Sequence, residues 1–129
     1  MVLDASAVLE LLLRTTAGNR VEARLFSNRG SLHAPHLIDV EVAQVIRGHA
    51  TAGILSVSRG KEALQDLADL SLNRHAHTGS LPRIWELRHN LTAYDAAYVA
   101  LAEALDAPLL TCDRKLAKAT NHRARIELV

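Results

Sequence analysis

Short apolar runs alternate along this chain with longer stretches in which apolar side chains recur at helical spacing. The runs at 1–4 and 108–111 are too short to form helices, and good helix formers follow the first of them. A strand, a helix and a further strand together form the unit from which parallel sheets are built. The alternation therefore predicts an α/β fold, a three-layer α/β/α sandwich around a mostly parallel sheet.

Proline, glycine and polar turn residues set the expected boundaries of the elements. Pro35 stands at the entrance of a helix, Gly53 ends that helix, and residues 15–19 separate two earlier helices. The segment 72–77 is polar, as expected of an edge strand. The expected strands are 1–4, 31–34, 72–77, 108–111 and 125–129, and the expected helices are 5–14, 20–26, 35–52, 58–71, 81–88, 92–105 and 114–119.

The length of 129 residues suits one domain with a substantial core and is too short for two. No repeat or linker divides the chain, so we expect a single domain over residues 1–129. The one cysteine, Cys112, excludes an internal disulfide and fits a reducing compartment. The first residues do not have the pattern of a signal peptide, and the apolar stretch 96–105 is short and contains Glu103. We expect a cytoplasmic protein without a membrane segment.

Positive charge is concentrated near the end of the chain, although the net charge is only +1. The segment 114–125 contains five cations and no acid, and Arg114, Lys115 and Lys118 are its candidates for binding RNA phosphates. The alternative is a solvated terminal helix and loop. Aromatic residues are too few for an extended platform on which bases stack, so a nucleic acid would be contacted mainly through its backbone.

Four acids are expected near one end of the predicted sheet. Asp4 closes the first strand, and Asp113 closes the strand at 108–111. Asp95 lies one turn into the helix before that strand, and Glu41 lies on the helix after the strand at 31–34. The carboxyl ends of parallel strands meet at one edge of a sheet, where ligands bind. The sequence therefore predicts that these acids converge.

Each acid also has a structural interpretation. Asp4 and Asp113 stand where they could cap the helices that follow them, and Thr92 and Asp95 have the spacing of a capping box. Glu41 could be a surface residue beside an apolar stripe. For Asp4, Asp95 and Asp113 taken singly, the structural role is the favoured one.

Taken together, the four acids point to a metal site. Carboxylates that converge repel one another unless a cation lies between them. Mg²⁺ or Mn²⁺ suits such oxygen ligands, and an ion of this kind can activate water and stabilise the charge on a phosphate. The predicted chemistry is phosphodiester hydrolysis.

Four segments carry a resemblance to a known family. They are 2–6 (VLDAS), 34–42 (APHLIDVEV), 94–102 (YDAAYVALA) and 110–116 (LTCDRKL). In their order and spacing the chain resembles the PIN domains, and specifically the VapC toxins of bacterial toxin–antitoxin pairs. The resemblance implies a Rossmann-like α/β/α fold and an endoribonuclease that depends on Mg²⁺ or Mn²⁺ and acts on tRNA or rRNA.

The resemblance also assigns roles to residues of this chain. Asp4 and Asp95 match the principal metal ligands, and Asp113 matches a further acid that binds metal directly or through water. Glu41 matches the acid that completes the catalytic site and orients the attacking water. The residues that match hydroxyl groups supporting the pocket are Ser6 and Thr111.

The partners implied by the resemblance are an RNA substrate, a second copy of the chain in a homodimer, and a small VapB-type antitoxin in a bacterial cytoplasm. The antitoxin of such a pair blocks the site with its tail. Lys115, Lys118 and Ala119 stand where some family members have another acid or an amide. The resemblance therefore favours one tightly bound ion, with a second arriving with the RNA.

Two rival interpretations come from other functional classes. A receiver-like Mg²⁺-binding signalling domain would need a pair of acids after its first strand, whereas Asp4 is followed by Ala5 and Ser6. A non-catalytic α/β binding module would be expected to have lost at least one of the four acids, and all four are present.

Overall fold

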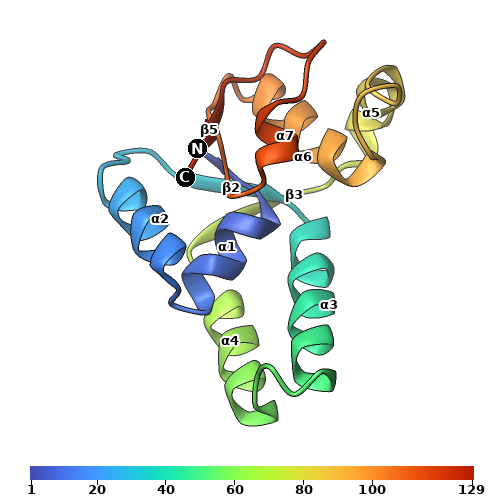
Figure 1. Ribbon diagram of the computed structural model, residues 1–129. Coiled ribbons are helices and arrows are strands. Elements are labelled where there is room, and N and C mark those ends of the chain that lie inside the picture. Colours follow the sequence, from blue (N-terminus) through green and yellow to red (C-terminus); the bar gives the residue numbers. More distant parts are fainter.

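Five parallel strands in the order β3–β2–β1–β4–β5 form the sheet of the computed structural model, which describes residues 1–129 (Figure 1). Every neighbouring pair of strands is parallel. The polar segment expected at an edge is indeed the edge strand β3. The bounds are β1 Val2–Leu3, β2 Leu32–Pro35, β3 Leu72–His75, β4 Leu109–Thr111 and β5 Ile126–Leu128.

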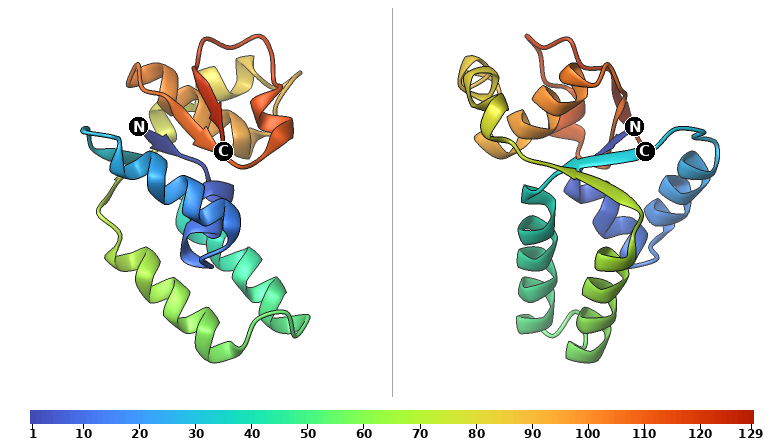
Figure 2. Two further views of the ribbon diagram at one scale, coloured as in Figure 1. Left: turned by 60° about the vertical axis from the view of Figure 1, so that its left-hand side comes forward. Right: turned by 180° about the vertical axis from the view of Figure 1, so that it is seen from behind.

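Helices cover both faces of the sheet, which confirms the three-layer α/β/α sandwich (Figures 1 and 2). The helices α1 to α4 pack together on one face, and α6 contacts β1, β2 and β4 on the other, beside α5 and α7. The first group is α1 Ala5–Leu12, α2 Thr16–Phe26, α3 Leu37–Thr51 and α4 Val57–Asp69. The second is the 3₁₀ helix η1 Thr78–Ser80, α5 Leu81–Glu86, α6 Ala93–Ala104 and α7 Arg114–Ala117.

The central strands are apolar because both of their faces are covered. Val2 and Leu3 of β1 and Leu109 and Leu110 of β4 are completely buried. Strands buried on both faces are expected to be continuously apolar rather than alternating. No helix in the structure has both the length and the apolar character needed to cross a membrane.

The order of the strands creates a switch point between β1 and β4. The chain moves outward from β1 through β2 to β3, and then returns by α5 and α6 to place β4 on the other side of β1. Connections leave the carboxyl ends of these two central strands in opposite directions, and in such sheets ligands bind beyond these ends, at the place that we call the crevice. Leu3 pairs with Leu110, so that Asp4 and Thr111 follow at this same end.

The segment 15–19 was wrongly predicted to interrupt the helices at 5–14 and 20–26. The first helix ends earlier, at Leu12, and α2 begins at Thr16. Thr15 caps α2, since its Oγ1 accepts a hydrogen bond of 3.0 Å from the N–H of Gly18. A Cβ atom on Gly18 would lie 2.1 Å from the carbonyl oxygen of Glu10. This glycine therefore lets α2 approach α1 closely and does not break the helix.

The start of α3 also differs from the prediction. Pro35 is the last residue of β2 and not the first of the helix, which begins at Leu37. The N–H of His36 donates to the carbonyl oxygen of His75 at 2.9 Å, so the hydrogen bonding between β2 and β3 continues one residue past the end of β2. Gly53 follows the helix with φ of +72°, the conformation expected of a glycine just beyond a helix end.

Candidate active site

Asp4 lies at the carboxyl end of β1 and is 6% exposed. It begins α1 as its N-cap, because its Oδ2 accepts a hydrogen bond of 3.3 Å from the N–H of Ser6. The same oxygen accepts hydrogen bonds from the hydroxyl groups of Ser6 at 2.5 Å and Thr111 at 2.8 Å. The capping interpretation of Asp4 is therefore confirmed. It accounts for only one of the two carboxyl oxygens.

The second oxygen of Asp4 is available to a ligand. No group of the chain donates a hydrogen bond to Oδ1, and Oδ1 is not among the buried polar atoms that lack a partner. It must therefore retain some exposure at the surface of the crevice. A fixed carboxylate with one engaged and one open oxygen is suited to binding a cation.

Two hydroxyl groups hold Asp4 in place by connecting it to the loop after β4. The Ser6 hydroxyl accepts a hydrogen bond of 2.9 Å from the N–H of Cys112, and Thr111 Oγ1 accepts one of 2.9 Å from the N–H of Asp113. Both hydroxyl groups donate to Asp4, and their oxygens lie 3.1 Å apart. This network fixes the carboxylate by joining the ends of the two central strands.

Asp95 lies in the first turn of α6 and pairs with the N-cap Thr92 as predicted, except that its carboxylate bonds the Thr92 hydroxyl and not the backbone N–H of a complete capping box. The Asp95 N–H donates to Thr92 Oγ1 at 3.1 Å, and the Thr92 hydroxyl donates to Asp95 Oδ2 at 2.9 Å. Asp95 is half-buried, and its pKa is raised, chiefly by burial and further by the charges of Asp4 and Asp113. The structural interpretation is confirmed for this residue too, and one oxygen again remains open.

Glu41 reaches the cluster from the second turn of α3, which follows β2. Burial raises its pKa, and the charges of Asp4 and Asp95 raise it further. The hydroxyl group of Tyr98 donates a hydrogen bond to Glu41 Oε2 and opposes that rise. Glu41 is therefore not the simple surface residue that the alternative interpretation suggested.

Tyr98 was not among the residues predicted to form the site. Its side chain is 1% exposed, and burial together with the neighbouring Glu41 raises the pKa of its hydroxyl. Tyr98 follows Asp95 by three residues, so the two side chains share one face of α6. That spacing was the available signal, but the phenol could equally have been assigned to the core.

Asp113 lies at the start of α7, where its Oδ1 accepts a hydrogen bond of 2.6 Å from the N–H of Lys115. It is the N-cap of this short helix, as the structural interpretation held. Its charge also contributes to the raised pKa of Asp95.

The charge of Asp4 raises the pKa values of both Glu41 and Asp95, but the four acids do not form a closed cage. No three His, Cys, Asp or Glu side chains are arranged so that they could hold an ion by themselves. Mg²⁺ commonly binds through one or two carboxylates, with waters and substrate phosphate oxygens completing its shell. An open set of oxygen donors around Asp4 and Asp95 fits Mg²⁺ or Mn²⁺ by its chemistry.

The structure divides the positive segment 114–125 between the two ends of the sheet. Arg114, Lys115 and Lys118 are exposed on and beside α7, which starts at Asp113. Arg125 lies at the other end, where its carbonyl oxygen accepts a hydrogen bond of 2.9 Å from the N–H of Leu109 at the start of β4. Only Arg114, Lys115 and Lys118 therefore lie at the same end of the sheet as the acids, where they could contact the same ligand.

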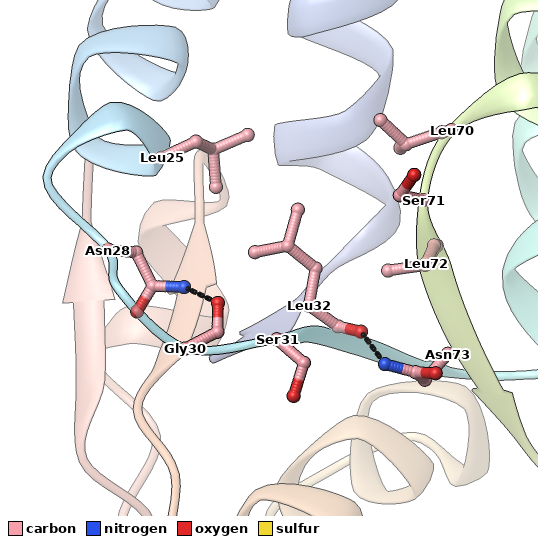
Figure 3. A pocket seen from close by; sticks show the side chains of 9 residues that line it. All are labelled: Leu25, Asn28, Gly30, Ser31, Leu32, Leu70, Ser71, Leu72 and Asn73. Atoms are coloured by element: carbon pink, nitrogen blue, oxygen red, sulfur yellow. Dashed lines mark hydrogen bonds between the residues drawn. The ribbon is translucent and has the colours of Figure 1, made fainter.

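A cavity at the opposite end of the sheet lies away from the acids. It has a volume of about 610 Å³ and lies at the amino ends of β2 and β3, where Figure 3 shows Leu32 and Leu72 facing into it. Asn28 and Asn73 donate to carbonyl oxygens at its wall, at 2.6 and 3.1 Å. No titratable side chain lines it. The cavity therefore offers no group for hydrolysis.

Comparison with known families and relatives adds evidence from the whole sequence. Residues 1–121 match the family model of the PIN domain. The chain is 42% identical over 129 residues to VapC ribonuclease Mb0985 of Mycobacterium bovis, covering 100% of this chain and 98% of the relative. It is 43% identical over 130 residues to Ribonuclease VapC12 of Mycobacterium tuberculosis, with the same coverage of each.

Solved structures show the same fold. PAE2754 from Pyrobaculum aerophilum superposes with a TM-score of 0.70 at 24% identity, over 97% of this chain and 81% of that one. VapC20 of Mycobacterium tuberculosis, described as a Sarcin-Ricin loop cleaving toxin, superposes with a TM-score of 0.66 at 13% identity. That match covers 95% of this chain and 98% of the other.

Proposed function

Because this chain belongs to the PIN-domain family of VapC ribonuclease toxins, we propose that it is an endoribonuclease dependent on Mg²⁺ or Mn²⁺. In this proposal residues 1–129 form one PIN domain. Asp4, Asp95 and Asp113 bind the metal directly or through water, and Glu41 completes the catalytic site. The observation that carries the proposal is the open oxygen of Asp4 beside two carboxyl groups whose pKa values are raised.

The bound ion would activate water and stabilise negative charge on the phosphate. Asp4 is held by Ser6 and Thr111, so that its open oxygen is fixed before any ligand arrives. A fixed donor loses little entropy on binding, which favours a defined position for the RNA phosphate.

We assign to Glu41 the role of general base for the attacking water. Tyr98 occupies its Oε2, which leaves Oε1 to accept a proton from that water as the oxygen attacks phosphorus. The bond from phosphorus to the leaving ribose oxygen then breaks, and that oxygen takes up a proton from solvent water. A carboxyl group with a raised pKa is a stronger base than an ordinary one, which suits this role.

The exposed cations Arg114, Lys115 and Lys118 would bind phosphates on either side of the cleaved bond. A relative with the same fold is described as cleaving the Sarcin-Ricin loop, which supports a structured RNA such as tRNA or rRNA as the substrate. Membership of the VapC family supports a cognate VapB-type antitoxin as inhibitor and a homodimer as the assembly.

The proposal is tested by incubating the purified protein with total bacterial RNA, with Mg²⁺, with Mn²⁺ and with a chelator. Sequencing of the new ends identifies the cleaved RNA. We expect cleavage that the chelator abolishes and that Asp4→Asn and Asp95→Asn each eliminate. Asp69→Asn is the matched control, because Asp69 ends α4 outside the crevice. Cleavage that persists in Asp4→Asn and Asp95→Asn at saturating metal would refute the assignment.

A further inference from the structure

An open groove lies between α3 and the beginning of α6. It has a volume of about 390 Å³, and we call it the Tyr94 groove. Its exposed side chains include Val40 at 65% and Tyr94 at 61%. The residues that line it are Leu37, Val40, Glu41, Gln44, Val45 and Tyr94.

The Tyr94 groove is continuous with the candidate active site. Glu41 belongs to both, because it lines the groove and its pKa responds to the charges of Asp4 and Asp95. Tyr94 immediately precedes Asp95 in the first turn of α6. An RNA chain whose phosphate is bound at the acids must therefore place a neighbouring nucleotide at or beside this groove.

We propose that the Tyr94 groove binds one unpaired base of the RNA, belonging to a nucleotide next to the cleaved phosphate. The inference rests on the proposed ribonuclease function and adds a subsite to it. Tyr94 offers an exposed aromatic ring, and stacking on such a ring is the common way in which proteins bind unpaired bases. Leu37, Val40 and Val45 supply an apolar wall for the base.

A polar group in the groove favours a base over a purely apolar occupant. The Gln44 side chain lines the groove and makes no hydrogen bond within the chain, so its amide is free to donate and accept. A base edge presents donors and acceptors that match such an amide, whereas an apolar side chain would leave it unsatisfied. A single tyrosine serves one base, which agrees with the scarcity of aromatic residues.

The test compares binding of two labelled oligomers by fluorescence anisotropy. One is a single-stranded RNA of mixed sequence, and the other has the same ribose-phosphate backbone with abasic residues throughout. Binding is measured in full-length Asp4→Asn protein, which prevents cleavage. Into it are introduced Tyr94→Leu, which removes the ring, and Tyr94→Phe, which keeps it. Trp85→Leu is the control for losing an exposed aromatic, because Trp85 lies on α5 outside the groove.

We expect Tyr94→Leu to weaken binding of the RNA by about tenfold and to leave binding of the abasic oligomer unchanged. Tyr94→Phe and Trp85→Leu should bind the RNA within about twofold of the parent. The inference is overturned if Tyr94→Leu binds the RNA as tightly as the parent, or loses equal affinity for both oligomers. It is also overturned if sedimentation shows that Tyr94→Leu dissociates a dimer, because the groove would then be a contact between copies.

Failure of this inference can be told apart from failure of the proposed function. Cleavage by the unmodified chain without discrimination between the two oligomers in binding would refute the base subsite alone. Discrimination between the oligomers that Tyr94→Leu removes, without cleavage by the unmodified chain, would refute the ribonuclease proposal and retain the Tyr94 groove as a base-binding site.

Discussion

The hydroxyl group of Tyr98 donates a hydrogen bond to Glu41 Oε2 across 57 residues of sequence. This contact joins α6 to α3 and opposes the rise in the pKa of Glu41 that burial causes. We predict that Tyr98→Phe raises the pKa of Glu41 and destabilises the fold by about 1 kcal/mol. Carbon NMR of the carboxyl group, titrated in metal-free protein, measures the pKa.

The control for this prediction is Tyr94→Phe, since the Tyr94 hydroxyl makes no hydrogen bond within the chain. It should leave the pKa of Glu41 unchanged. The prediction fails if the two variants titrate alike.

Removing a ligand charge should abolish the response to metal without unfolding the protein. In Asp95→Asn the amide oxygen can still accept the hydrogen bond from Thr92, and repulsion from Asp4 and Asp113 is relieved. We expect metal-free stability to stay within about 1 kcal/mol of the parent, or to rise. Melting with and without Mg²⁺ checks this, because only the parent should gain stability from the ion. An equal gain in the variant would contradict the ligand assignment.

The pH dependence of metal-free stability should have a distinctive sign. The pKa values of Glu41 and Asp95 are raised in the folded protein, so the fold holds their protons more tightly than the unfolded chain does. The contribution of these two carboxyl groups to the free energy of unfolding should therefore increase as the pH falls from neutrality towards the ordinary carboxyl pKa. Asp95→Asn should show a smaller increase in urea titrations. An identical pH dependence in the parent and in Asp95→Asn would refute the repulsion.

Glu103 should show the opposite dependence. Its pKa is lowered, chiefly by the hydrogen bond from Arg83 at 2.8 Å. The stabilisation from this pair is present above the ordinary carboxyl pKa of about 4.3 and is lost as the pH falls through the lowered value. Glu103→Gln should cost about 1–2 kcal/mol at neutral pH and approach the parent's stability in acid. A constant difference at all pH values would contradict the ion pair as the cause.

Thr111 should matter through its hydroxyl group rather than its shape. Thr111→Val leaves Asp4 without one donor and the N–H of Asp113 without its acceptor, in a fully buried place. The expected cost is about 1–3 kcal/mol. Thr111→Ser retains the hydroxyl and should recover most of the loss in chemical denaturation. If both variants are equally unstable, the methyl group and not the hydrogen bonds is responsible.

The two positive groups of the terminal segment should differ in their effect on RNA binding. Reversal of Lys115 and Lys118 to glutamate should weaken binding and reduce its dependence on salt, since fewer counterions are released. Reversal of Arg123 and Arg125 changes net charge equally, but Arg125 lies at the opposite end of the sheet. The salt dependence of that second variant should match the parent. Equal slopes for both double variants would mean that only net charge matters.

The elements that depend on strong periodicity were predicted well, and those that depend on tertiary contact were not. The helix at 92–105 and the strand at 108–111 were placed within a few residues because their apolar residues are buried on nearly all sides. Gly18 was wrongly predicted to break a helix. A glycine is needed there because a side chain would collide with the carbonyl group of Glu10 on a neighbouring helix. No local pattern reveals such an approach.

In the candidate site, too, some residues could be predicted from the sequence and others could not. Asp4, Glu41, Asp95 and Asp113 could be selected because strand ends in a parallel sheet converge, and their mutual electrostatic influence agrees with that expectation. The division of the positive segment could not be foreseen, because it depends on where the chain turns back to form β5. The role of Tyr98 depends on Glu41 of α3 and Tyr98 of α6 meeting at the crevice from opposite faces of the sheet, which the sequence pattern leaves undefined.

Asp4 and Asp113 each use one carboxyl oxygen to cap a helix and leave the other uncommitted. The codons for aspartate and asparagine differ by one nucleotide, and asparagine is an equally good helix cap. A single transition in the gene could therefore silence the enzyme while leaving its surface intact. Inactive copies of this fold are thus within one mutational step, and they could still occupy an inhibitor that recognises that surface.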